Sequence, residues 1–128
     1  MNLRIPEWAE GASLAVNGKR VSEPTVPGTF AAVRREWKSG DRVELELPLR
    51  VRLEPLDARH ANLVALLCGP RVLFAVGEKS SGTMDRQRLL AAKKAGRSEW
   101  RAETPTGELE FLPFTEIQDQ RYCTYLKV

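Results

Sequence analysis

Hydrophobic and polar side chains alternate at period two along several short stretches of the chain, a pattern that predicts β-strands. The clearest stretch is residues 42–47, where valine and leucine point to one face and arginine and glutamate to the other. Such a strand is typical of an antiparallel sheet with one face on the core and one in solvent. The alternation resumes at residues 49–54, after Pro48, which predicts a bent strand that passes from one sheet to the next.

A hairpin is predicted near the start of the chain. Residues 13–16 alternate in the same way and are followed directly by Asn17 and Gly18. Asn-Gly is a strong hairpin signal because both residues tolerate the positive φ angles of a type I′ turn. Residues 20–22 are therefore expected to form the returning strand.

Two continuous apolar runs, residues 64–68 and 72–76, predict central strands that are buried on both faces. Other β-rich or alternating segments predict the remaining strands. These segments are residues 3–5, 29–37, 100–103, 108–112 and 122–128.

Signals for helices are almost absent. Only residues 85–95 combine a capping Asp85 with helix-favouring leucine, alanine and lysine, and residues 78–88, the least patterned, are expected to form a flexible loop. Roughly eight to ten short strands with regular turn signals predict an all-β fold, an antiparallel β-sandwich or jelly roll with at most one short helix. The length fits a single domain over residues 1–128.

Composition and charge narrow the classes of partner. Hydrophobic residues make up 42% and charged residues 29% of the chain, which is typical of a packed globular domain. The net charge is +3, but 17 acidic residues are interleaved with 20 basic ones and no long basic run exists. This pattern argues against nucleic-acid binding. No apolar stretch has the length of a membrane span or the form of a secretory signal, so no membrane partner is expected.

The residues that carry enzyme chemistry are few and scattered. His60 is the only histidine, and no Gly-x-Ser-x-Gly elbow supplies a nucleophile for it. Cys68 and Cys123 lack the close spacing of metal ligands, so neither a metal site nor a cofactor is expected. Glu44 and Glu46 lie on the same face of a predicted strand, where a glycosidase could place a pair of carboxylates. Arginines surround them, however, which is typical of a sheet face in contact with solvent. We therefore expect no catalytic residue.

Tryptophans are the side chains best suited to stack on a sugar ring. Trp8 lies in an irregular segment, and Trp8 and Trp100 are the candidates for carbohydrate binding. Trp37 ends a predicted strand, where burial is expected. A buried anchoring role is the alternative for each ring, because tryptophan contributes a large area to protein cores.

Five motifs in succession resemble one known enzyme family. In order and approximate spacing they are similar to the region that follows the catalytic barrel in glycoside hydrolase family 127, the β-L-arabinofuranosidase-like enzymes. The motifs are LRIPEWA at residues 3–9, VNGK at 16–19, REWKSGDRVELELPL at 35–49, VALLCGPRVLF at 64–74, and a tail that runs from LPFTEI at 112–117 to RYCTY at 121–125.

The resemblance implies a non-catalytic accessory β-sandwich of a glycoside hydrolase. In that family an α/α barrel carries the catalytic acidic residues and a zinc-bound cysteine cluster, and this barrel, the implied partner, is absent from these residues. Leu49 stands where the family has methionine, Leu67 replaces a polar or basic residue, and Cys68 occupies a position that is often basic. None of these residues takes a catalytic or zinc-binding role.

Two other functions stay open. One is a stand-alone carbohydrate-binding module that uses Trp8 or Trp100. The other is a protein-interaction module whose open sheet edges pair with a partner or with a second copy of the chain.

Overall fold

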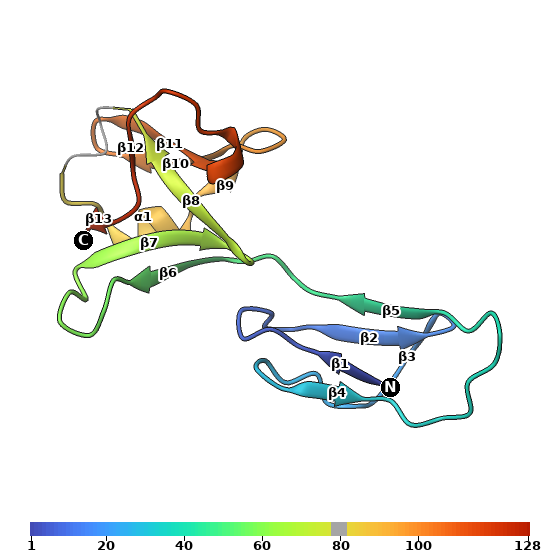
Figure 1. Cartoon of the computed structure of the whole chain (residues 1–128). Coiled ribbons are helices and arrows are strands. Elements are labelled where there is room, and N and C mark those ends of the chain that lie inside the picture. Colours follow the sequence, from blue (N-terminus) through green and yellow to red (C-terminus); the bar gives the residue numbers. More distant parts are fainter. Residues whose placement is uncertain (78–81) are drawn as a thin grey trace. The chain divides into compact units, whose positions relative to one another are not determined.

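A computed structural model of the chain describes residues 1–77 and 82–128. The fold is all-β with antiparallel strand pairs, as predicted (Figure 1). Contacts divide the chain into two compact units, residues 1–50 and 51–128, each with a hydrophobic core of its own. A single sandwich domain over residues 1–128 stays a prediction, and the two units are described separately.

The first unit consists of two small sheets. Strand β1 (Asn2–Arg4) pairs with β4 (Phe30–Ala32), and a second sheet has the order β3 (Lys19–Arg20), β2 (Ser13–Val16), β5 (Val43–Glu46). Alternation along these strands sends one set of side chains into a shared core. The buried residues of this core are Ile5, Ala9, Ala12, Leu14, Val16, Ala31 and Val33.

The hairpin predicted at Asn17 and Gly18 is confirmed. Both residues have positive φ angles, 52° and 75°, and β2 pairs with β3 directly across them. The strand predicted over residues 29–37 is shorter than expected, because β4 ends at Ala32. The alternating segments around Pro48 form two strands in different sheets, β5 in the first unit and β6 (Val51–Pro55) in the second.

The second unit contains one eight-stranded sheet. Its main path runs β13-β7-β8-β11-β10-β9, with β6 paired to β7 and β12 paired to β8. The bounds are β7 (Leu63–Cys68), β8 (Arg71–Val76), β9 (Lys93–Lys94), β10 (Trp100–Thr104), β11 (Gly107–Pro113), β12 (Tyr122–Cys123) and β13 (Leu126–Lys127).

The β7–β8 hairpin opens after three residue pairs, the last of which is Leu66 with Leu73. Beyond this point β7 pairs instead with β13, through Val64 and Leu126, and β8 pairs with β12, through Ala75 and Cys123. The two final strands therefore take the positions that each arm of the hairpin leaves open.

Helix α1 (Arg86–Leu90) lies against β6 and β10 and is shorter than the predicted 85–95 segment. Its N-terminus is capped as expected, because Asp85 accepts a hydrogen bond of 2.9 Å from the backbone N–H of Arg88. The helix stops because Lys94 pairs with Trp100 as part of strand β9. Of the loop predicted over residues 78–88, residues 78–81 lie outside the described part of the chain.

Side chains from six elements, together with Ala92 after the helix, form the core of the second unit. The helix contributes Leu89, and the strands β7, β8, β10, β11 and β13 contribute most of the rest. The buried set is Val64, Leu66, Cys68, Leu73, Ala75, Leu89, Ala92, Trp100, Ala102, Leu109, Phe111 and Leu126. Within the described residues, no helix has the length and apolar character of a membrane span.

Candidate functional site

His60 lies in an exposed turn and is engaged by the carboxylate of that same turn. Its Nδ1 is 2.8 Å from Oδ1 of Asp57, and this oxygen also accepts the backbone N–H groups of Arg59 and His60 at 2.8 Å each. These contacts, led by the one from the His60 ring, hold the pKa of Asp57 below its usual value. The pair thus closes a surface turn, and no nucleophile is part of it.

The other titratable candidates lie apart from one another. Cys68 is buried in β7, and Cys123 is half-buried in β12, where its thiol donates to the carbonyl of Tyr125 at 2.9 Å. Glu44 is ion-paired with Arg42 at 2.8 Å on the exposed face of β5. Across residues 1–77 and 82–128, no three His, Cys, Asp or Glu side chains are grouped as metal ligands.

The three tryptophans occupy unlike environments. Trp100 is only 3% exposed, and the charged ends of Arg71 and Lys94 lie 5.5 and 5.6 Å from the centre of its ring system. A sugar therefore has no open ring face at Trp100. Trp8 is half-buried and packs against the core of the first unit.

Trp37 is more exposed than the sequence predicted. It is 37% exposed, with the guanidinium of Arg35 at 5.4 Å from its ring. The reason is that β4 ends at Ala32, so Trp37 lies in the loop before the next turn rather than at the end of a strand.

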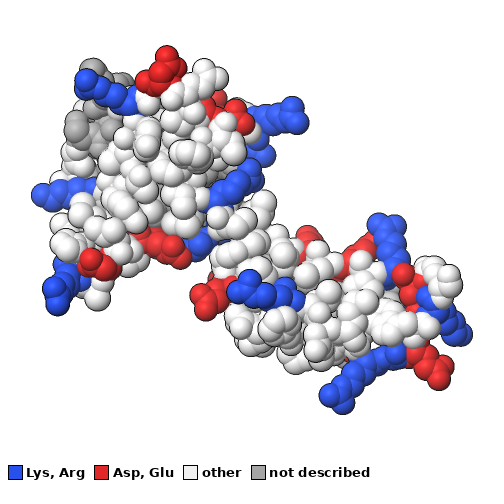
Figure 2. Space-filling model, in the orientation of Figure 1, with Lys and Arg blue, Asp and Glu red and all other residues white. Residues whose placement is uncertain are grey.

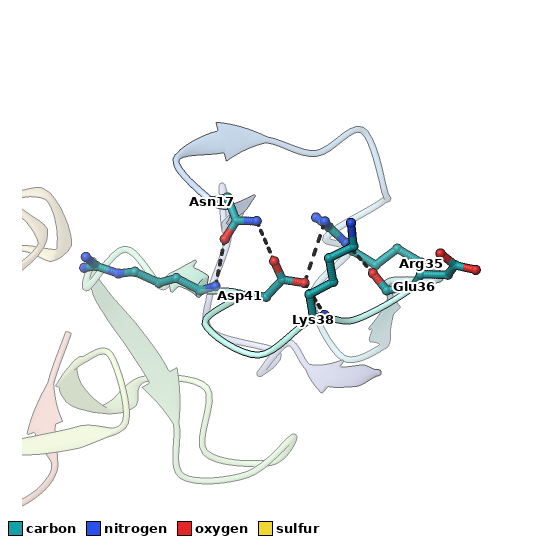
Figure 3. Close-up of polar contacts among 6 residues, drawn as sticks. Asn17, Arg35, Glu36, Lys38 and Asp41 are labelled. Atoms are coloured by element: carbon teal, nitrogen blue, oxygen red, sulfur yellow. Dashed lines mark hydrogen bonds and ion pairs between the residues drawn. The ribbon is translucent and has the colours of Figure 1, made fainter.

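A polar network joins the hairpin turn at Asn17 to the turn that ends at Asp41 (Figure 3). The side-chain amide of Asn17 donates to Asp41 at 2.8 Å and accepts the backbone N–H of Arg42 at 2.8 Å. Asp41 also accepts the backbone N–H of Lys38 at 2.9 Å, and Arg35 lies 3.7 Å away. Residues from the VNGK and REWKSGD motifs therefore act together to hold two turns of the first unit.

We expect this network to make stability depend on acid. The Asn17 amide, the Lys38 N–H and the Arg35 charge hold the pKa of Asp41 below its usual value. A lowered pKa contributes stability above the unfolded-state value of about 4, and this contribution is lost as the pH falls through the lower folded-state pKa. Asp41→Asn should therefore lower the melting temperature at pH 7 and narrow the fall in melting temperature between pH 7 and pH 3.

Thermal unfolding followed by circular dichroism at both pH values measures this effect. Asp119→Asn, which removes the same charge from an exposed position in the other unit, is the control and should leave the acid dependence of the first unit as in the wild type. Equal acid sensitivity of the wild type and Asp41→Asn contradicts the assigned role of the network.

An exposed group of apolar side chains escaped the sequence-based prediction. Residues 72–76 were expected to be buried on both faces, but only Leu73 and Ala75 are buried. The other face of β8 joins neighbours on β11, on β12 and in the 3-10 turn Phe114–Glu116. We call this group the aromatic face; its members are Val72, Phe74, Val76, Leu112, Phe114 and Tyr122.

Comparison with known proteins supports one family. Residues 1–49 match the sequence family described as "Beta-L-arabinofuranosidase, GH127 middle domain". A solved structure described as a glycoside hydrolase is similar over 98% of this chain, with 22% identity and a TM-score of 0.70. No curated protein matches the sequence.

Two further solved structures are GH127 enzymes. The β-L-arabinofuranosidase of Geobacillus stearothermophilus T6 matches 98% of this chain with 20% identity and a TM-score of 0.66. A GH127 β-arabinofuranosidase matches 100% with 21% identity and a TM-score of 0.66. This chain spans only 26–27% of the length of these proteins. The predicted resemblance is confirmed, by sequence over residues 1–49 and by fold over the whole chain.

Proposed function

We propose that this chain, whose first 49 residues match a GH127 middle domain, is a non-catalytic accessory region of a glycoside hydrolase of that kind. One observation carries the proposal. The whole chain has the fold of a segment that makes up about a quarter of the solved enzymes, and the matching family is described as the middle domain. Among its described residues, no three His, Cys, Asp or Glu side chains are grouped as metal ligands.

The accessory role we infer is structural support. In this proposal the chain packs on the catalytic barrel and stabilises it, while the barrel performs hydrolysis. Two compact cores of aliphatic and aromatic side chains suit such a role, because a well-packed core resists deformation. No buried polar or charged residue interrupts these cores in the part of the chain that the structure describes.

The purified chain is expected to hydrolyse no β-L-arabinofuranoside. A chromogenic arabinofuranoside assay, with the Geobacillus enzyme as the positive control, measures this directly. The expected rate equals that of buffer alone. Turnover that a single substitution within the chain abolishes contradicts the accessory role.

The carbohydrate-binding alternative now depends on Trp8, because Trp100 is buried. Titration with arabinose-containing oligosaccharides, followed by tryptophan fluorescence, tests it. A saturable signal that Trp8→Ala removes favours sugar binding, and Trp37→Ala, which alters an exposed ring outside the proposed site, is the matched control.

Two of the sheet edges are poorly suited to pairing with a partner strand, although β5 and β6 also lie at edges and have four and five residues. β3 and β9 each end a sheet, and each has only two residues. Both are composed entirely of lysine and arginine. Short, basic edge strands are a common protection against strand addition, so these edges offer little to a partner.

A further inference from the structure

The aromatic face arises because the apolar run of β8 supplies side chains to both sides of the sheet. Phe74 lies opposite Leu112 of β11, and Val76 lies opposite Tyr122 of β12. Phe114 is 70% exposed and Tyr122 is 52% exposed. Most of the outer side of these three neighbouring segments is therefore apolar, and the exposed Glu110 of β11, which lies opposite Val76, stands at its margin.

The outer side of the adjoining strands β6 and β7 is shielded from solvent in a different way. On the outer side of β7, Leu67 and Ala65 are each only 6% exposed. Their cross-strand neighbours on β6 are Arg52 and Glu54, and Arg52 also donates to the carbonyl of Gly69. Long charged side chains can cover apolar surface with their aliphatic stems. The outer side of β7 is thus buried within the chain, whereas Phe114 and Tyr122 stay exposed.

The rings are arranged unlike a sugar-binding platform. Phe74 meets Tyr122 edge to face, with planes at 87° and centroids 5.5 Å apart, and meets Phe114 at 56° and 6.1 Å. Stacking on a sugar requires a flat, open ring face, which rings at these angles do not provide together. Such mutual packing is typical of aromatic side chains within protein interiors and interfaces.

We propose that the aromatic face is the surface by which this region packs against the catalytic domain of the same enzyme. This inference rests on the proposed function, and it identifies the surface through which the accessory region contacts the catalytic domain. The occupant is an apolar, uncharged protein surface, since none of the six side chains is charged at neutral pH. Figure 2 agrees, because the side of the 51–128 unit shown there over β8 has a broad uncharged area with charged side chains around it.

The two exposed rings of the aromatic face, taken alone, cover far less than one side of a stable dimer interface and nearly as much as one side of a small interface between domains of one polypeptide. A buried aromatic side chain covers about 150–250 Å², so Phe114 and Tyr122 at their exposures of 70% and 52% offer about 250 Å² together. A stable dimer needs about 800 Å² per partner, whereas interfaces between domains of one chain start near 300 Å² a side. Tethering raises the effective concentration, so a small interface is sufficient. The fold indeed occurs within chains of which it forms about a quarter.

A double variant, Phe114→Ser with Tyr122→Ser, tests the proposal. The matched control is Val26→Ser with Phe30→Ser, which removes apolar side chains of similar exposure, 52% and 64%, from the first unit. Each form of this chain is fused in place of the quarter of the Geobacillus enzyme that this fold matches, so that it is tethered to the rest of that enzyme. We expect the wild type and the control to raise the melting temperature of the rest of that enzyme in scanning calorimetry, and the double variant to lose most of this gain.

Each outcome decides between the two proposals. Equal stabilisation of the fused enzyme by the wild type and the double variant overturns the interface and leaves the accessory role. No stabilisation by any form, with all forms folded by circular dichroism, overturns the accessory role. If the wild type forms a dimer in analytical ultracentrifugation and the double variant stays a monomer, the occupant is a second copy of the chain, which overturns the proposed interface. Saturable binding of an oligosaccharide that only the double variant loses overturns it in favour of a sugar site.

Discussion

Replacing Phe111 with alanine is expected to unfold the 51–128 unit. Phe111 is fully buried, and its strand β11 lies between β8 and β10 in the sheet. Large-to-small substitutions of buried phenylalanine destabilise proteins by about 3–5 kcal/mol, since the lost burial leaves a cavity that relaxes only in part. This loss is a large share of the roughly 5–15 kcal/mol that stabilises an ordinary domain.

Phe114→Ala is the matched control for Phe111→Ala. The same side chain is removed three residues further along, but Phe114 is 70% exposed, so we expect a change of about 0.5 kcal/mol or less in the isolated chain. Urea unfolding followed through the amide signals of the second unit separates the two variants. Similar unfolding midpoints for both contradict the assigned core.

Replacing Leu14 with alanine is expected to unfold the 1–50 unit. Leu14 is 2% exposed on β2, the middle strand of its sheet, where it lies opposite Leu45 of β5. The expected loss is about 2–5 kcal/mol. A unit of this size buries a smaller fraction of its surface than a larger domain does, so its stability is marginal and the loss removes most of that stability.

The test for Leu14→Ala follows the two units separately. Amide signals of residues 1–50 should collapse, while those of Phe111 and its neighbours in the second core persist. Leu49→Ala, which alters a side chain that is 53% exposed, should leave both sets of signals unchanged. Loss of both sets in Leu14→Ala contradicts the division into two cores.

Local signals in the sequence predicted the elements that depend on local chemistry. The Asn17–Gly18 turn was identified because its positive φ angles suit those two residues. The cap at Asp85 was identified because a carboxylate is a good acceptor at a helix N-terminus. Both features depend on residues within four positions of one another.

Tertiary pairing explains the differences from the sequence-based prediction. Lys93 and Lys94 favour helix, but they pair with β10 and end the helical segment early. The burial of Trp100 depends on its own strand pairing with β9 and β11, which residue type alone does not reveal. For the same reason the pattern of residues 72–76 did not distinguish a strand buried on both faces from one with an open side.

The candidate site shows the same limit. Residue type selected Trp8 and Trp100 as candidates, but the most exposed aromatic rings of the second unit are those of Phe114 and Tyr122. These two residues belong to separate turns and strands that β8 brings together. The apolar side chains at both odd and even positions of β8 gave no signal of this open side, because β7 has the same pattern and is buried on both sides.

The opened β7–β8 hairpin has a consequence for how the protein is made. Leu126 pairs with Val64 across almost half of the chain, and Met84 donates to the carbonyl of Lys127 at 2.7 Å. Contacts between residues so distant in sequence slow folding, because a long loop must close before they form. On the ribosome, the second unit can therefore complete its core only after residues 126–128 have emerged, and the earlier strands must wait with their apolar sides open to chaperones.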